Sequence, residues 1–247
     1  MSSTVFVTAF VPGASNHRSL DEYMALGNHL LIATTPCPTI VFLDPSLILP
    51  SSSSSYVTVV PFAKEDLSLW AQKEKATAFA PHTTNPTKDT LEYFLVQCEK
   101  TEWLRRATVL RPGANEYVWI DFGIAHIFSS PTVLADAVHG LQQRIQTRCP
   151  DNDEKITVAS CWPMHYSFHG ALQHDIAWYF AGGVLGGSAQ AITRFADAVH
   201  AKCMHMLEEQ HTLTWEINVW YLVYLDHPDW FRPYAADHNN TILDGYA

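Results

Sequence analysis

Basic residues are scarce in this chain. Lysine and arginine together number 15 against 25 aspartates and glutamates, which gives a formal net charge of −10 at pH 7. Proteins that bind nucleic-acid backbones or anionic membrane surfaces need a basic face, and this composition argues against both partners. It is compatible with a small anionic ligand that a few local cations or a metal ion would hold.

Long apolar runs and paired cysteines are also lacking. No stretch approaches the roughly 20 apolar residues that cross a bilayer. The first residues lack the charged start and the apolar run of a signal peptide. The five cysteines are odd in number and scattered, without a C-x-x-C pair, which is typical of reduced thiols. We therefore expect a soluble, cytoplasmic protein without a transmembrane segment.

Several catalytic motifs are missing too. The chain has no G-x-x-x-x-G-K-[ST] phosphate loop, no G-x-S-x-G elbow and no H-E-x-x-H zinc motif. What is present is a large apolar fraction: 47% of the 247 residues are hydrophobic and 12% are aromatic, enough to bury a sizeable core. Without internal repeats, and with the serine run 51–55 as a surface loop, we expect one domain over residues 1–247.

Strand and helix patterns alternate along the chain. Continuous β-branched and aromatic runs predict strands at Thr4–Phe10, Thr39–Leu43, Tyr56–Val60, Tyr117–Asp121 and Ile156–Ala159. Because these runs are apolar throughout, we expect both faces of each strand to be buried, as in a mostly parallel sheet. Helical patterns occupy residues 20–32, 89–106, 189–209 and 214–225 and a segment that begins at Pro131. The fold class is therefore α/β, with a central mostly parallel, mixed sheet flanked by helices.

Acidic side chains and a glycine cluster are the candidates for chemistry. Asp121 ends an apolar strand at the sheet edge where α/β proteins collect ligands, so it can hold a metal ion or simply cap a turn. Glu216 stands among aromatic residues at a helix start, where it can act as a general base or only suit the helix dipole. Residues 182–187 predict a tight turn before a helix, or a close backbone approach to a sugar or phosphate.

Four segments together resemble the HtrL/YibB-like family, whose members are considered glycosyltransferase-like and occur near surface-polysaccharide genes. The resemblance spans nearly the whole chain, and the block around Trp119-Ile-Asp-Phe-Gly123 is its most specific part. The segments are Lys100–Arg106, Tyr117–Phe128, Phe180–Gly187 and Trp215–Trp220. The resemblance implies a GT-A fold, in which a D-x-D signature brings Mn²⁺ or Mg²⁺ to the diphosphate of a nucleotide sugar.

The resemblance also implies roles for individual residues. Asp121 matches the first aspartate of D-x-D, but Gly123 stands in the place of the second, which puts the metal in doubt or moves a ligand elsewhere, such as to His238. Glu216 is the first choice of base and Asp175 the second. The residues implied in donor binding are Thr8, Phe10, Asp44, Lys100, Arg105, Gly182 and Gly183, with an exposed helix face as the alternative role for at least two of Lys100, Arg105 and Arg106.

The resulting hypothesis is a hexosyl- or pentosyltransferase that moves a sugar from a UDP-sugar to a glycan or glycoconjugate acceptor. Two alternatives remain. The incomplete D-x-D is compatible with a degenerate transferase fold that binds a glycan or a protein without catalysis. A more distant alternative is a metallohydrolase built on His165, His169 and Asp175, although scattered core or surface histidines account for that spacing as well.

Overall fold

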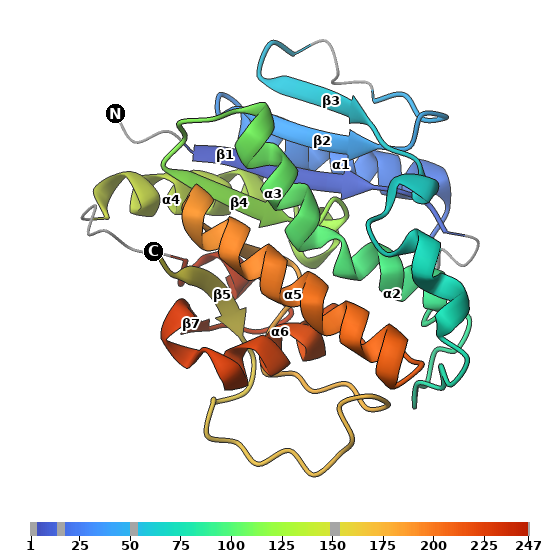
Figure 1. Cartoon of the computed structure of the whole chain (residues 1–247). Helices are drawn as coiled ribbons and strands as arrows, with labels where there is room; N and C mark the ends of the chain where they lie inside the picture. Colours follow the sequence, from blue (N-terminus) through green and yellow to red (C-terminus); the bar gives the residue numbers. More distant parts are fainter. Residues whose placement is uncertain (1–3, 14–17, 50–53, 149–153, 247) are drawn as a thin grey trace.

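The computed structural model describes residues 4–13, 18–49, 54–148 and 154–246. Its scaffold is one seven-stranded sheet of order β3-β2-β1-β4-β6-β5-β7 (Figure 1). Neighbours among β1 to β4 pair in parallel, β6 runs antiparallel to both β4 and β5, and β5 pairs in parallel with β7. This arrangement confirms the predicted mixed, mostly parallel sheet. The strands are β1 Thr4–Phe10, β2 Thr39–Leu43, β3 Val57–Pro61, β4 Glu116–Ile120, β5 Ile156–Ser160, β6 Val184–Gly187 and β7 Phe231–Ala235.

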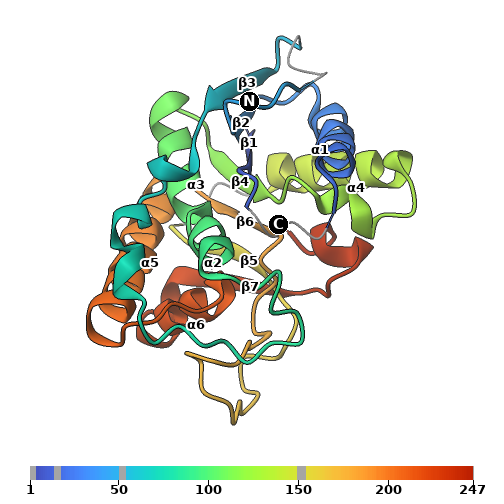
Figure 2. The same cartoon turned by 90° about the vertical axis from the view of Figure 1, so that its right-hand side faces the viewer.

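Helices cover both faces of the sheet. Helices α1 and α4 lie on one face, whereas α3 and α5 lie on the other with α2 and α6 beside them (Figures 1 and 2). The α-helices are α1 Leu20–Thr34, α2 Leu91–Cys98, α3 Lys100–Leu110, α4 Pro131–Thr147, α5 Ala189–Glu209 and α6 Glu216–Asp226. Short 3₁₀ turns are η2 Lys64–Asp66, η3 Trp70–Lys75, η4 Ile124–Ile127, η5 Pro228–Trp230 and η6 Asn240–Leu243.

Strand β1, inside the sheet, shows why the predicted apolar runs are continuous. Successive side chains of a strand point to opposite faces. In β1, Val5 and Val7 pack under α3 and α5, while Phe6 packs under α1 and α4. Helices cover both faces of the sheet at β1, so every residue of this strand is buried, as predicted. Strand β3 is different: it forms an edge of the sheet and its residues are only half-buried or exposed, so the prediction of two buried faces is wrong for this run.

A tryptophan stack fixes α3 against β4. The rings of Trp103 in α3 and Trp119 in β4 lie 5.6 Å apart with an angle of 7° between their planes. Trp103 also stacks on Phe42 of β2 at 6.3 Å and is buried. Large aromatic side chains contribute most to core packing, and a stacked pair adds about 0.5–1.5 kcal/mol beyond the area it buries. The stack therefore holds the first turn of α3 above the carboxyl end of β4.

Three predicted elements differ in the structure. The single helix expected over 89–106 is two helices, because the amide of Glu99 bonds to the carbonyl of Val96 three residues back and the axis breaks there. The first of the two helices begins at Leu91, two residues later than predicted, after the cap Thr90, whose hydroxyl accepts the Tyr93 amide. The second half of the glycine cluster is strand β6 rather than a turn.

Strands β6 and β7 were not predicted from the sequence, because each contains a residue that is uncommon in strands. Gly186 lies where a Cβ would overlap the hydroxyl of Tyr246 and come within 2.5 Å of the Tyr117 carbonyl oxygen, so a glycine is required inside this strand. Strand β7 contains Pro233, which is tolerated because β7 lies at the sheet edge. Neither strand therefore has a strong β-branched signal.

Three further expectations from the sequence concern membrane helices, cysteines and the serine run. Among them, no helix is both long and apolar enough to cross a membrane. Cys37, Cys98, Cys161 and Cys203 are free thiols, whereas Cys149 lies outside the described residues. Most of the serine run predicted as a surface loop, residues 51–53, also lies outside them.

Candidate active site

A cleft of about 640 Å³ opens at the carboxyl edge of the parallel strands. The carboxyl ends of parallel strands meet at the same edge of a sheet, which is where open α/β folds bind ligands. Residues 9–11 at the end of β1 and residues 121–124 after β4 form its floor, together with the first residues of α3 and α6. Loop residues 82–85, Ile176 and Trp178 contribute further walls.

A buried lysine lies at the centre of this floor. Lys100 Nζ is 2.8 Å from Glu216 Oε1 and 3.0 Å from Asp121 Oδ1, and it donates to the carbonyl oxygen of Gly182 at 3.0 Å. The Lys100 side chain is 3% exposed, whereas that of Asp121 is 36% exposed to the cleft. Four residues from four distant segments are thus joined through one ammonium group. We call this set, Lys100, Asp121, Gly182 and Glu216, the lysine cluster.

The elements of the fold place Asp121 toward Lys100. Asp121 follows Trp119 by two residues, so its side chain lies on the α3 side of the sheet. Trp119 Nε1 donates to Asp121 Oδ1 at 2.7 Å, and the Asp121 amide donates to the Gly183 carbonyl oxygen at 3.0 Å. The two contacts of the carboxylate, from Lys100 and Trp119, both use Oδ1. Oδ2 faces Gly183, where a Cβ would stand 4.0 Å away.

Glu216 reaches the cluster because position 182 has no side chain. Glu216 is the first residue of α6 and is buried. A Cβ on Gly182 would overlap Glu216 Oε1 and would lie 3.2 Å from Lys100 Nζ. The glycine therefore permits the close approach of a carboxylate and an ammonium to the backbone.

The electrostatics of the cluster favour a charged lysine. Burial alone opposes the ammonium, but the negative charges of Asp121 and Glu216 and the hydrogen bonds to both outweigh it, so the pKa of Lys100 is raised. One lysine side chain faces two acidic side chains, which gives a formal charge of −1 on the floor of the cleft.

His238 also lines this cleft. Its ring packs edge-on against Trp178, with 4.6 Å between the ring centroids, and its outer edge is exposed. Partial desolvation lowers the pKa of His238, although the charges of Asp121 and Glu216 oppose this effect. His238 and Asp121 thus line one cleft, and their role as metal ligands stays a prediction.

An aromatic group closes the end of the cleft at β1. Phe10 stacks on Phe122 at 5.1 Å with an angle of 5° and contacts the ring of Tyr23 at 5.0 Å. Gly27 in α1 makes room for this packing, because a Cβ there would overlap the Phe122 ring. All three rings line the cleft, and only Phe10 was expected from the sequence.

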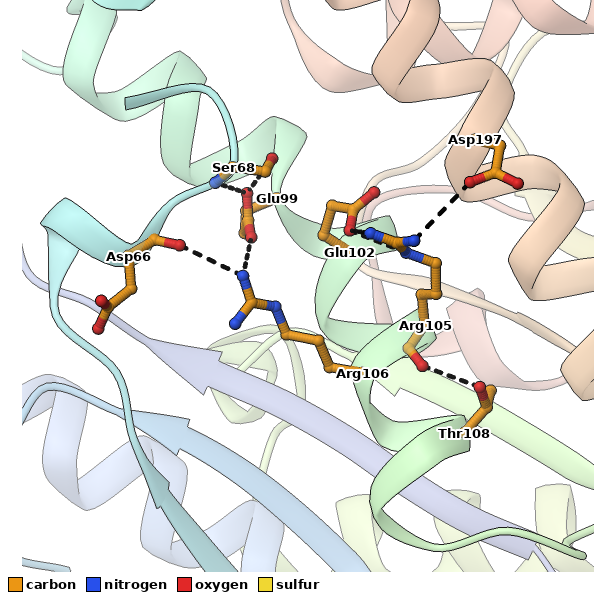
Figure 3. Close-up of polar contacts among 8 residues, drawn as sticks. All are labelled: Asp66, Ser68, Glu99, Glu102, Arg105, Arg106, Thr108 and Asp197. Carbon is orange, nitrogen blue, oxygen red and sulfur yellow. Dashed lines mark hydrogen bonds and ion pairs between the residues drawn. The ribbon is translucent and has the colours of Figure 1, made fainter. Parts of the chain in front are cut away.

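The structure does not bring three of the proposed donor-binding residues to the cleft. Thr8 is buried within β1, and Asp44 accepts hydrogen bonds from the amide and hydroxyl of Ser46 in a turn. Arg105 lies on another side of α3, where it binds Glu102 and stands 3.9 Å from Asp197 (Figure 3).

Asp175 lies in the loop between β5 and β6, beside the cleft rather than in it. Its Oδ1 is 2.9 Å from Nδ1 of His82, a residue that does line the cleft, and its Oδ2 accepts the amide of Ala171 at 2.8 Å. The Ala171 hydrogen bond, followed by His82, lowers the pKa of Asp175. Through these contacts, the Asp175 carboxylate stabilises the conformation of the loop between β5 and β6.

The histidines on which the hydrolase hypothesis was based, His165 and His169, do not form a cluster of metal ligands. His165 and His169 are both exposed on the loop after β5. In the part of the chain that the structure describes, no group of three or more His, Cys, Asp or Glu side chains is placed to hold a metal ion. A protein-only zinc centre is therefore not formed by these residues.

The comparison with solved structures concerns the fold. A glycosyltransferase involved in the glycosylation of the major capsid of PBCV-1 superimposes with a TM-score of 0.50 at 9% identity, over 94% of this chain and 81% of that one. The chain has a glycosyltransferase-like fold. No protein-family model and no curated protein sequence matches it. The resemblance to the HtrL/YibB-like family therefore stays a prediction.

Three further structures are less similar. Mouse xyloside xylosyltransferase 1 gives a TM-score of 0.48 at 8% identity, over 94% of this chain and 84% of that one. Rv0371c from Mycobacterium tuberculosis gives 0.45 at 13% identity, over 96% and 89%. A manganese complex of Rv0371c gives 0.42 at 14% identity over the same shares.

Proposed function

We propose that this chain is a glycosyltransferase that moves a sugar from a nucleotide-sugar donor, a UDP-sugar, to a hydroxyl group of a glycan or glycoconjugate. The observation that carries the proposal is the lysine cluster on the floor of the cleft. In a glycosyltransferase-like fold, it sets two carboxylates and a glycine backbone at the carboxyl edge of the parallel strands. A cleft of about 640 Å³ lies within the usual range for a small-molecule site.

The walls of the cleft suggest how the donor lies. The aromatic end formed by Phe10, Tyr23 and Phe122 suits the flat base of the nucleotide. The backbone at Gly182 and Gly183 suits the sugar, because the missing side chains permit close approach. This orientation places the diphosphate between the two, at Asp121. Thr8, Asp44 and Arg105 lie outside this path.

A divalent ion fits the cluster only together with the donor. Asp121 Oδ2 is not engaged by Lys100 or Trp119, and the floor carries a formal charge of −1, so a hard cation such as Mn²⁺ or Mg²⁺ has one carboxylate oxygen available, with His238 as the second side chain. The remaining ligands would be phosphate oxygens and water. When bound, the ion supplies electrostatic stabilisation of the negative charge that develops on the leaving diphosphate.

The transfer itself exchanges one bond for another. The bond between the anomeric carbon and the β-phosphate oxygen breaks, and its electron pair leaves with the nucleoside diphosphate. A bond forms between the anomeric carbon and the acceptor oxygen, whose proton must go to a base. We assign this role to Glu216, which lies beside Gly182 in the cleft, in preference to Asp175 outside it.

Thermal shift measurements test the donor and the metal together. UDP at 100 times its Kd adds about 2.7 kcal/mol of stability, which corresponds to a rise in Tm of about 5–10 °C for a chain of this size. We expect Mn²⁺ alone to leave Tm unchanged, and Mn²⁺ with UDP to raise it more than UDP with EDTA. The Asp121→Asn variant should lose this additional gain. A Tm that responds to no nucleoside diphosphate would refute the proposal.

Turnover separates an enzyme from a fold that only binds. We expect release of UDP from at least one UDP-sugar in a panel of hexose and pentose donors. Glu216→Gln should abolish this release, whereas the matched change Asp175→Asn should retain it. The opposite order would transfer the role of base to Asp175, and UDP binding without turnover on any donor or acceptor would favour a binding module.

A further inference from the structure

Lys100 has the charge that would suit a phosphate ligand, but all three N–H donors of its ammonium group are already hydrogen-bonded to protein oxygens. An ammonium group has three N–H donors, and three oxygen atoms lie within 3.0 Å of Nζ: Glu216 Oε1, Asp121 Oδ1 and the Gly182 carbonyl oxygen. All of these acceptors belong to the protein. A phosphate could replace one of them only by separating Lys100 from the Glu216 carboxylate, the Asp121 carboxylate or the buried Gly182 carbonyl group.

The surroundings of Lys100 fix its ammonium group in place. The side chain is 3% exposed, and Nζ lies 5.9 Å from the ring centroid of Trp119, within reach of a cation–π interaction. The Trp103 and Trp119 stack holds the helix turn that carries it. Each of its three partners comes from a different segment, namely the end of β4, the turn before β6 and the start of α6.

We propose that Lys100 is a positioning residue, an internal counterion that holds the base Glu216, the carboxylate of Asp121 and the Gly182 backbone in their working arrangement, and that it does not bind the donor's phosphate. This inference rests on the proposed function. A displacement of about 1 Å in reacting groups can cost about 100-fold in rate. Loss of Lys100 would free two carboxylates to move apart and would turn the Gly182 carbonyl group.

Lys100→Met tests the proposal through the separation of kcat from donor affinity. We expect kcat for UDP release to fall about 100-fold, while KM for the donor and the Kd of UDP stay close to their wild-type values. A phosphate ligand behaves differently, because its removal weakens UDP binding together with the rate. Lys75→Met is the matched control, since Lys75 forms a surface ion pair with Glu208 at 2.8 Å. It should change neither quantity.

A charge-balanced variant covers the case in which Lys100→Met does not fold. Removing one partner of a buried ion pair leaves an uncompensated charge, and removing both is better tolerated. We expect the double variant Lys100→Met with Glu216→Gln to have a higher urea midpoint than Lys100→Met alone and to bind UDP as the wild type does. This comparison needs no turnover.

The outcomes separate the two proposals. A wild-type protein that binds no UDP overturns the proposed function, whatever Lys100 does. A wild-type protein that binds UDP, with variants whose UDP affinity falls as far as their kcat, overturns the positioning role and makes Lys100 a donor ligand. Unchanged kcat in Lys100→Met also overturns it. A fall in kcat at constant UDP affinity, with the double variant more stable than the single one, supports it.

Discussion

Glu99 offers a test of the fold that is independent of the cleft. This residue joins α2 to α3, and its carboxylate is buried. The amide and hydroxyl of Ser68 donate to Oε2 at 2.8 and 2.7 Å, whereas Oε1 lies 3.8 Å from the guanidinium of Arg106 (Figure 3). Burial raises the pKa of Glu99 to about 7, against the lowering effect of the Ser68 hydrogen bonds.

The direction of the pH effect follows from proton binding. In the unfolded chain the pKa returns to its ordinary value of 4.5, so between pH 4.5 and about 7 the folded state keeps a proton that the unfolded state has lost. The contribution to the free energy of unfolding is therefore complete below pH 4.5 and is lost as the pH rises through about 7. A change in pKa of this size corresponds to about 3 kcal/mol.

The change Glu99→Gln removes this titration while keeping the shape of the side chain. Urea unfolding of both proteins at several values between pH 4 and pH 8 measures the effect. We expect the stability of the variant relative to the wild type to rise by about 3 kcal/mol across this range. Glu209→Gln, at an exposed position, is the control and should follow the wild type at each pH. Parallel curves for wild type and Glu99→Gln would refute the argument.

Two further predictions concern packing near the site. Gly182→Ala places a methyl group on Glu216 Oε1, so we expect UDP release to fall about 100-fold while the far-ultraviolet circular dichroism spectrum stays that of the wild type; unchanged release would disprove the close approach. Trp103→Ala removes the stack on Trp119 and should lower the free energy of unfolding by about 3–5 kcal/mol in urea. The exposed Val109→Ala on the same helix should change it by less than about 0.5 kcal/mol, and equal effects would contradict this assignment.

Much of the architecture could be predicted because its signals are local. Apolar runs mark β1 and β2 to the residue, and Ser130 followed by Pro131 marks the start of α4. Asp121 and Glu216 could also be proposed, since an acid at a strand end or in a first helical turn is visible in the chain. Their assembly could not be predicted. Lys100 and Glu216 are 116 residues apart, and no local pattern pairs them.

The sequence by itself determined where five of the seven strands and most of the helices form, since hydrophobic periodicity, caps and prolines act over a few residues. The tertiary structure alone decided that the glycine cluster contributes a strand between β4 and β5, and that Lys100 is buried between two acids rather than exposed on its helix. The physical reason is that both outcomes depend on contacts between distant segments. Close packing decides which backbone approaches which, and a buried charge persists only where folding brings its counter-charges to it.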